Sequence, residues 1–251
     1  MSGHSKWSSI KHKKGAADAK RGQLFTKLTR ALIVAAKDGG PDPAANLALQ
    51  NAIDKARAAS MPKDNIERAI ARGAGTGADA ATFEHISYEG YGPGGVAVYV
   101  DVLTDNRNRT AGEVRHIFAR ADGNLAESGS VAWLFERKGV ILVDAAAVDE
   151  DELMLAAADA GAEDITQEGS SFEVVCATEN LHSVRQALES AGIEIGEAEA
   201  TMLPKTTVAI EDEATARKIL RLIDSLEEND DVQDVYANFD IPEQVLETVL
   251  V

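Results

Sequence analysis

The feature that most constrains the fold is a change in hydrophobic periodicity near residue 73. Before this point, apolar residues recur with the 3.6-residue period of an amphipathic helix, as between Leu24 and Ala35. After it, every second residue from Val96 to Val102 is valine, as expected for a strand with one buried face. The glycine-rich segment GAGTGADA (73–80) separates the two patterns and predicts a linker at a domain boundary.

Three helices are expected before this linker. The first begins near Ala17 and ends at the DGGPDP segment, residues 38–43. Asp42 and Pro43 have the pattern of an N-cap followed by a first-turn proline, so we expect the second helix to begin there. The third helix covers 61–73, with Asp64 and Glu67 at the spacing of a capping box. Together these helices predict a small basic bundle.

The remaining sequence predicts two α/β domains. Residues 136–203 have the expected order strand, helix, strand, strand, helix, strand, which is the ferredoxin-like arrangement. The helix and strand that follow cannot form a domain alone, so we expect them to complete the sheet begun in 80–135. The fold class is α+β: an N-terminal three-helix domain followed by two α/β ferredoxin-like-type domains, the last inserted in the second. The predicted domains are 1–75, 80–135 plus 204–251, and 136–203.

Two local predictions concern the segment 105–135. Thr110 and Glu113 have capping-box spacing, which predicts a helix that begins after Thr110 and leaves DNRNRT (105–110) just ahead of it. The hydrophobic segment SVAWLF (130–135) is expected to form a strand.

Charge is distributed very unevenly. The net charge is −17, which taken alone argues against a nucleic-acid partner. However, residues 1–72 carry +8 and residues 73–251 carry −25. Within the first part, residues 1–37 hold nine basic residues and one acidic residue. This asymmetry is typical of a basic nucleic-acid-binding arm on an acidic body that phosphate would repel elsewhere.

The first candidate site is the basic N-terminal segment. Its cations could neutralise phosphates, and Trp7 could stack on a base. The alternative is a solvated tail with Trp7 packed on the bundle. The candidate nucleic-acid-binding residues here are Lys6, Trp7, Lys11, His12, Lys13, Lys14, Lys20, Arg21, Lys27 and Arg30.

The second candidate site is DNRNRT, where Arg107 and Arg109 precede the expected helix and Arg115 extends the patch. Free N–H groups, a positive dipole end and guanidinium groups suit a phosphate. The alternative is that these arginines pair with local carboxylates such as Asp101, Asp105 or Glu113. The sequence leaves the two interpretations open.

Other site classes are not favoured. Gly90, Gly92 and Gly95 match G-x-G-x-x-G, but a strand rather than a helix follows them, so they predict a hairpin tip instead of a dinucleotide loop. His4 and His12 lack further ligands at metal-binding spacing. The single cysteine, Cys176, lies in an expected buried strand, which fits a reducing cytoplasm without disulfides.

No catalytic dyad or triad is evident in the sequence, and no apolar run is long enough to span a membrane. We therefore expect a cytoplasmic protein that is not an enzyme and needs no cofactor. The acidic surface disfavours self-association, so we expect a monomer.

The chain also resembles a known family. The motifs GHSKW, KRGQLFTKL, MPKDNIERAI, YEGYGPGG, DNRNRT and GSVAWLF occur in this order. Together they resemble the YebC family, whose mitochondrial member is a translational activator of cytochrome c oxidase subunit I. The resemblance covers nearly the whole chain and implies three domains and a non-enzymatic factor.

Two functions are associated with that family, and they are competing hypotheses here. One is a ribosome-associated translation factor that binds rRNA or tRNA and relieves stalling on proline-rich stretches. The other is a DNA-binding transcriptional regulator, for which the N-terminal helices would be a helix-turn-helix variant. An adaptor that binds proteins is a third possibility.

Overall fold

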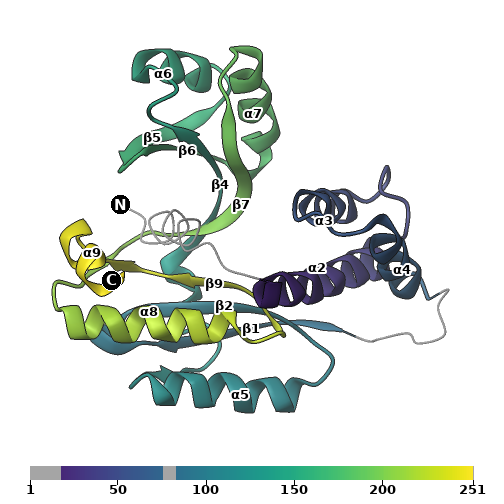
Figure 1. Cartoon of the computed structure of the whole chain (residues 1–251), viewed down its shortest axis with the longest axis vertical. Coiled ribbons are helices and arrows are strands. Elements are labelled where there is room, and N and C mark those ends of the chain that lie inside the picture. Colours follow the sequence, from purple (N-terminus) through teal and green to yellow (C-terminus); the bar gives the residue numbers. More distant parts are fainter. Residues whose placement is uncertain (1–17, 76–82, 251) are drawn as a thin grey trace. The chain divides into compact units, whose positions relative to one another are not determined.

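The structure is a computed structural model that describes residues 18–75 and 83–250. The described residues form two compact units. One, here called the inserted unit, contains 133–207 and 238–240. The other, the main unit, contains the described residues up to 132 together with 208–237 and 241–250. Figure 1 shows the elements of each unit in sequence colours.

The main unit begins with three helices, α2 (Asp18–Gly39), α3 (Leu47–Ala58) and α4 (Lys63–Gly73). Their apolar faces share a core that includes Leu32, Ile33, Leu49 and Ile53. The close approach of α4 to α2 requires Gly73, because a Cβ there would lie 2.3 Å from the Ile33 carbonyl oxygen. The helical N-terminal domain predicted from periodicity is therefore confirmed.

Both predicted N-caps in this domain are wrong. The N-cap of α3 is Asn46, whose side chain accepts from the Leu49 N–H at 3.0 Å and donates to the Ala35 carbonyl at 2.7 Å. Because Asn46 joins the end of α2 to the start of α3, the second helix begins later than Asp42 and Pro43 suggest. At α4, the Pro62 carbonyl accepts the Asn65 N–H, so the Asp64 capping box does not form.

The sheet of the main unit has the order β3-β1-β2-β9 and is antiparallel at each pairing. Its strands are β1 (Glu84–Tyr91), β2 (Ala97–Thr104), β3 (Asn124–Leu125) and β9 (Val232–Ala237). Helices α5 (Arg107–Arg120) and α8 (Glu213–Glu227) lie side by side on one face of this sheet (Figure 1). The helix and strand after residue 204 thus complete the earlier sheet, as predicted.

The glycine motif lies at the hairpin between β1 and β2: Gly90 is in β1, paired with Val98, and Gly92 and Gly95 are in the turn. A short 3-10 helix, Pro93–Gly95, connects the strands, and Gly94 and Gly95 have positive φ. Gly90 lies against α5, where a Cβ would be 2.6 Å from the Phe118 ring. Gly92 lies against α8, where a Cβ would be 3.0 Å from Leu222. The hairpin-tip prediction is confirmed for Gly92 and Gly95, whereas Gly90 is a paired residue of β1. Gly90 and Gly92 also allow the helices to pack closely.

The inserted unit is ferredoxin-like. It contains β4 (Phe135–Asp144), α6 (Glu150–Ala158), β5 (Ala162–Glu168), β6 (Ser171–Cys176), α7 (Leu181–Ser190) and β7 (Ile195–Pro204). The strand order is β5-β6-β4-β7, with Ile141, Phe172, Val174 and Leu188 among the core residues. The predicted α+β fold class, with the last α/β domain inserted in the second, is confirmed.

Several short elements complete the chain, and one local prediction fails. They are a 3-10 helix at Thr178–Asn180, β8 (Val208–Ala209), β10 (Phe239–Asp240) and α9 (Glu243–Leu250). Residues 130–135 do not form the expected strand, since Ala132–Leu134 is a 3-10 helix and β4 begins only at Phe135. The backbone turns there because the N–H groups of Val131 and Ala132 are held by the Glu89 carboxylate.

Candidate nucleic-acid interface

Helix α5 begins earlier than predicted. Its N-cap is Asn106, whose side chain accepts from the Arg109 N–H at 3.1 Å, and the Asn106 N–H donates to Thr104 Oγ1 at 2.9 Å. The predicted N-cap, Thr110, is buried within the first turns. DNRNRT therefore supplies the cap and first turn of α5 instead of a loop ahead of it. Asparagine at the N-cap is physically favoured because it satisfies an N–H group that has no partner in the helix.

A buried carboxylate organises the start of α5. Asp231, just before β9, has a side chain that is 3% exposed. It accepts hydrogen bonds from the hydroxyl groups of Thr104 and Thr110 and forms an ion pair with Arg109 at 2.7 Å. Burial alone would raise the pKa of Asp231, but the bonds from Arg109 and Thr110, with nearby Arg30, hold this pKa below its usual value.

The arginines of DNRNRT consequently have different environments. Arg109 pairs with Asp231 and with Asp105, so the alternative interpretation, pairing with carboxylates, describes this residue. Arg107 and Arg115 are exposed, and neither forms an ion pair with a residue in the described ranges. Beside them, the Tyr88 hydroxyl donates to the Arg107 carbonyl at 3.3 Å. Burial raises the pKa of Tyr88, so this hydroxyl stays a neutral donor.

The basic residues of α2 contact the end of α8. Lys27 Nζ donates to the Glu227 carbonyl at 2.7 Å, and Arg30 donates to the Asp230 carbonyl and pairs with Asp231 at 2.7 Å. The Arg30 guanidinium also lies 5.6 Å from the centre of the Phe83 ring. These cations satisfy carbonyl groups at the negative end of the α8 dipole. The contacts of Lys27 and Arg30 with this end of α8 therefore explain their positions without a ligand.

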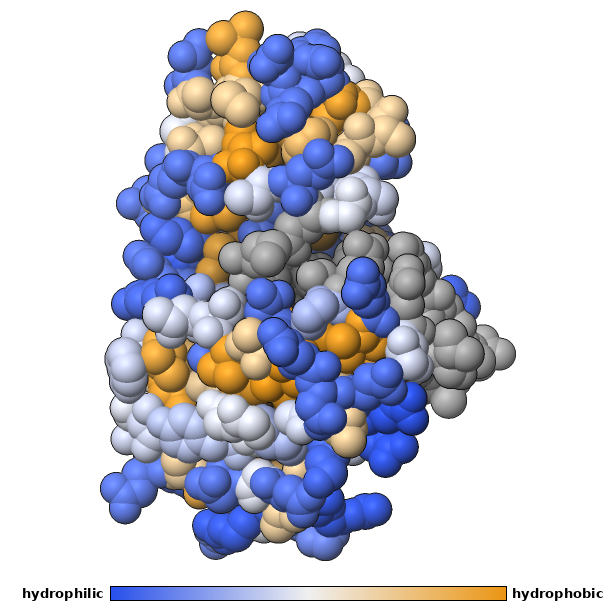
Figure 2. Space-filling model, turned by 90° about the vertical axis from the view of Figure 1, so that its left-hand side faces the viewer, coloured by the Kyte–Doolittle hydropathy of each residue, from blue (hydrophilic) through white to orange (hydrophobic). Residues whose placement is uncertain are grey.

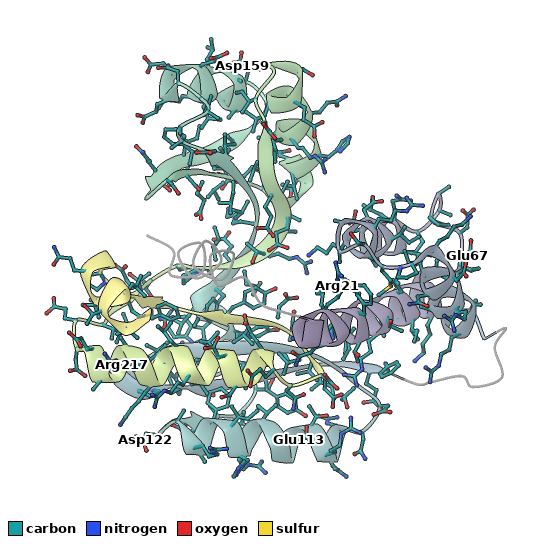
Figure 3. All side chains as sticks on the ribbon, viewed as in Figure 1. Arg21, Glu67, Glu113, Asp122, Asp159 and Arg217 are labelled. Atoms are coloured by element: carbon teal, nitrogen blue, oxygen red, sulfur yellow. The ribbon has the colours of Figure 1, made fainter. Side chains whose placement is uncertain are left out.

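The remaining candidates of the N-terminal segment lie at or beyond its described end. Arg21 is exposed near the start of α2 and is labelled in Figure 3. Lys20 lies in α2, and its side chain is outside the described part. The candidates that precede the described residues are Lys6, Trp7, Lys11, His12, Lys13 and Lys14. The structure thus brings Arg107 and Arg115 together on α5, and Lys27 and Arg30 at the end of α8.

Sequence reasoning missed the two buried carboxylates of the main unit, Asp231 and Glu89. Glu89 is 3% exposed and accepts the N–H groups of Gly129, Val131 and Ala132 at 2.7, 2.6 and 2.7 Å. Burial alone would raise the pKa of Glu89, but these three hydrogen bonds hold it below its usual value. The sequence feature that could have indicated a buried carboxylate is Glu89 itself, a charged residue among the tyrosine and glycine residues of YEGYG.

Within the described ranges, no cluster of histidine, cysteine and carboxylate residues could hold a metal ion. No helix in that part of the chain is long and apolar enough to cross a membrane. What the described surface offers at α5 is a set of guanidinium groups that can form hydrogen bonds with phosphate oxygens.

Comparison with known proteins identifies similar chains along the full length. A family model described as the TACO1/YebC protein N-terminal domain matches residues 5–76, and one described as the TACO1/YebC second and third domain matches residues 83–239. A relative from Rubrobacter xylanophilus is 61% identical over 99% of both chains and is called a probable transcriptional regulatory protein. A relative from Natranaerobius thermophilus, with the same description, is 53% identical over 99% of this chain and 100% of its own.

The fold also matches a crystal structure. It is that of a conserved hypothetical protein from Aquifex aeolicus, with a TM-score of 0.81 and 51% sequence identity. The match covers 91% of this chain and 94% of the other.

Proposed function

The chain belongs to the TACO1/YebC family, and from this premise we propose that it is a nucleic-acid-binding factor that regulates gene expression. More specifically, we propose a ribosome-associated translation factor that binds rRNA or tRNA and relieves stalling on proline-rich stretches. It acts as a monomer by positioning RNA, without a catalytic group or cofactor of its own.

The observation that carries this proposal is the position of positive charge. Residues 1–37 contain nine basic residues and one acidic residue, whereas residues 73–251 carry −25. Basic segments gain affinity for nucleic acid by releasing the counterions that phosphates hold. The acidic remainder is repelled by the same phosphates and keeps the bound orientation specific. The exposed Arg107 and Arg115 also support the proposal, because their guanidinium groups are accessible to phosphate.

Sedimentation tests the ribosome proposal. A tagged chain in lysate is run through a sucrose gradient at low salt, with and without ribonuclease. We expect co-migration with ribosomal particles that ribonuclease abolishes. If the chain stays at the top of the gradient in both samples, ribosome association is contradicted.

The contribution of the N-terminal segment is tested separately. Replacing Lys11, Lys13 and Lys14 with alanine removes three cations. Because each lost phosphate contact lowers the dependence of affinity on salt, the slope of log K against log salt should become shallower by about 2 to 3. An unchanged slope would show that this segment does not contact the nucleic acid.

A DNA-binding transcriptional regulator is the second candidate function. It is favoured by the descriptions of the relatives from Rubrobacter xylanophilus and Natranaerobius thermophilus as probable transcriptional regulatory proteins. In this case, footprinting on genomic DNA fragments should reveal protected sites with a defined sequence. Protection without sequence preference would argue against this function.

A further inference from the structure

Positive charge in the acidic part of the chain is concentrated on α5 and α8. Residues 73–251 contain eleven basic and thirty-six acidic residues. These two helices hold seven of those basic residues and only four of the acidic ones. The seven are Arg107, Arg109, Arg115, Arg120, Arg217, Lys218 and Arg221. These two helices therefore have the opposite charge balance from the rest of this part of the chain.

The two helices form one surface. They lie side by side and run antiparallel (Figures 1 and 3). Hydrogen bonds join them at the middle of α5 and just after its end. Lys218 Nζ donates to Asp122 Oδ2 at 2.6 Å, and Asn229 Nδ2 donates to Glu113 Oε2 at 2.8 Å. Apolar residues such as Phe118 on α5 are buried on the sheet side. The charged sides consequently face outward. The lower end of the molecule in Figure 2, where α5 lies, is mostly hydrophilic.

Helical spacing places cations from both helices along the line where they meet. Glu113 contacts the end of α8, and Arg120, seven residues later, shares that side of α5. Lys218 contacts the end of α5, and Arg221, three residues later, shares that side of α8. Arg120 and Arg221 therefore approach the same line from opposite sides.

Most of these cations are available to a ligand. Among residues in the described ranges, Arg107, Arg115, Arg120 and Arg221 are exposed and have no ion-pair partner. Lys218 pairs with Asp122, but both side chains are more than half exposed, at 51% and 69%. Exposed pairs of this kind contribute little to stability, so a phosphate can replace Asp122 at little cost.

We propose that the outer surface of α5 and α8 is a second RNA-binding surface, on which Arg120, Lys218 and Arg221 contact the phosphodiester backbone. This rests on the proposed function, because it takes RNA as the partner, and it extends the contact from the N-terminal segment to the second domain. The acidic residues elsewhere in 73–251 repel phosphate and direct the RNA strand to this layer. Guanidinium groups suit the role because they form two parallel hydrogen bonds with phosphate oxygens.

Charge reversal tests the surface. The Arg120→Glu, Arg221→Glu variant is compared with the Arg137→Glu, Arg185→Glu variant, which changes net charge equally but lies in the inserted unit. All four positions are exposed, so circular dichroism should be unchanged. If charge reversal at α5 and α8 alters the spectrum, the pair Arg120→Gln and Arg221→Gln replaces it.

Fluorescence anisotropy measures binding of each protein to a labelled 20-base-pair RNA duplex and to a DNA duplex of the same sequence.

We expect the α5 and α8 variant to bind the RNA duplex roughly 10 to 100 times more weakly than the unsubstituted chain, with a salt slope shallower by about 2. The control variant should lose less than about threefold, because it changes only the long-range field, which salt screens. Equal losses in both variants, while the unsubstituted chain binds RNA, would overturn this surface and leave the proposed function standing. No RNA binding by the unsubstituted chain, or binding of DNA alone, would overturn both this surface and the proposed RNA-binding translation factor.

Discussion

Arg30 on α2 and Asp231 before β9 form an ion pair at 2.7 Å, with side chains that are only 15% and 3% exposed. The pair joins the N-terminal helices to the sheet of the main unit. It is reinforced by Arg109, which contacts the other carboxylate oxygen at 2.7 Å. One carboxylate thus holds cations from two separate helices, and its loss would leave both without a buried counter-charge.

Asp231→Ala should therefore lower the free energy of unfolding by about 3 to 5 kcal/mol, because breaking a buried pair leaves an uncompensated charge. The matched control is Asp230→Ala, whose side chain is exposed and should cost less than about 0.5 kcal/mol. Urea unfolding followed by circular dichroism measures both. Equal midpoints for the two variants would show that Asp231 does not hold the helices to the sheet.

Acid should destabilise the main unit through Glu89 and Asp231. Both have a pKa lowered in the folded state, so their contribution is present above the unfolded pKa and is lost as pH falls through the folded value. Since unfolded carboxyl groups titrate near pH 4, the urea midpoint should fall as pH drops below about 4. Glu89→Gln should flatten this dependence, whereas Glu127→Gln, an exposed neighbour, should preserve it. A Glu89→Gln profile parallel to that of the unsubstituted chain would contradict the assignment.

The glycines of the hairpin contribute to packing. A Cβ at Gly90 would lie 2.6 Å from the Phe118 ring and 2.7 Å from the Asn124 carbonyl oxygen. Gly90→Ala should therefore lower the free energy of unfolding by about 1 to 3 kcal/mol, as overpacking does. Gly112→Ala provides the contrast, since it lies on the exposed side of α5 with nothing within 4 Å, and should stabilise by about 0.5 to 1 kcal/mol. Thermal unfolding measures both changes, and a stabilising Gly90→Ala would refute the close contact.

Periodicity was sufficient to predict the fold class and the hairpin at Gly90–Gly95, because alternating and 3.6-residue patterns report directly which faces are buried. Helix starts were harder to predict. Asn46 also donates to the Ala35 carbonyl, and Thr110 is buried against Asp231, and neither contact can be read from the local pattern. The contacts of the candidate site could not be predicted for the same reason. Nothing near DNRNRT indicates that Arg109 meets Asp231, which lies 122 residues away. The predicted domain boundaries and the nucleic-acid role of the site residues stay predictions.

The two kinds of arginine on α5 should separate binding from stability. Arg107 and Arg115 are exposed, so replacing both with alanine should weaken RNA binding by about tenfold and leave the urea midpoint unchanged. Arg109→Ala removes a partner of Asp231 and should lower the free energy of unfolding by about 1 to 3 kcal/mol. Anisotropy at fixed salt and urea unfolding of the same preparations measure both properties. If Arg109→Ala weakens binding as much as the double variant while stability is unchanged, Arg109 contacts phosphate and its pairing with Asp231 is not what fixes α5.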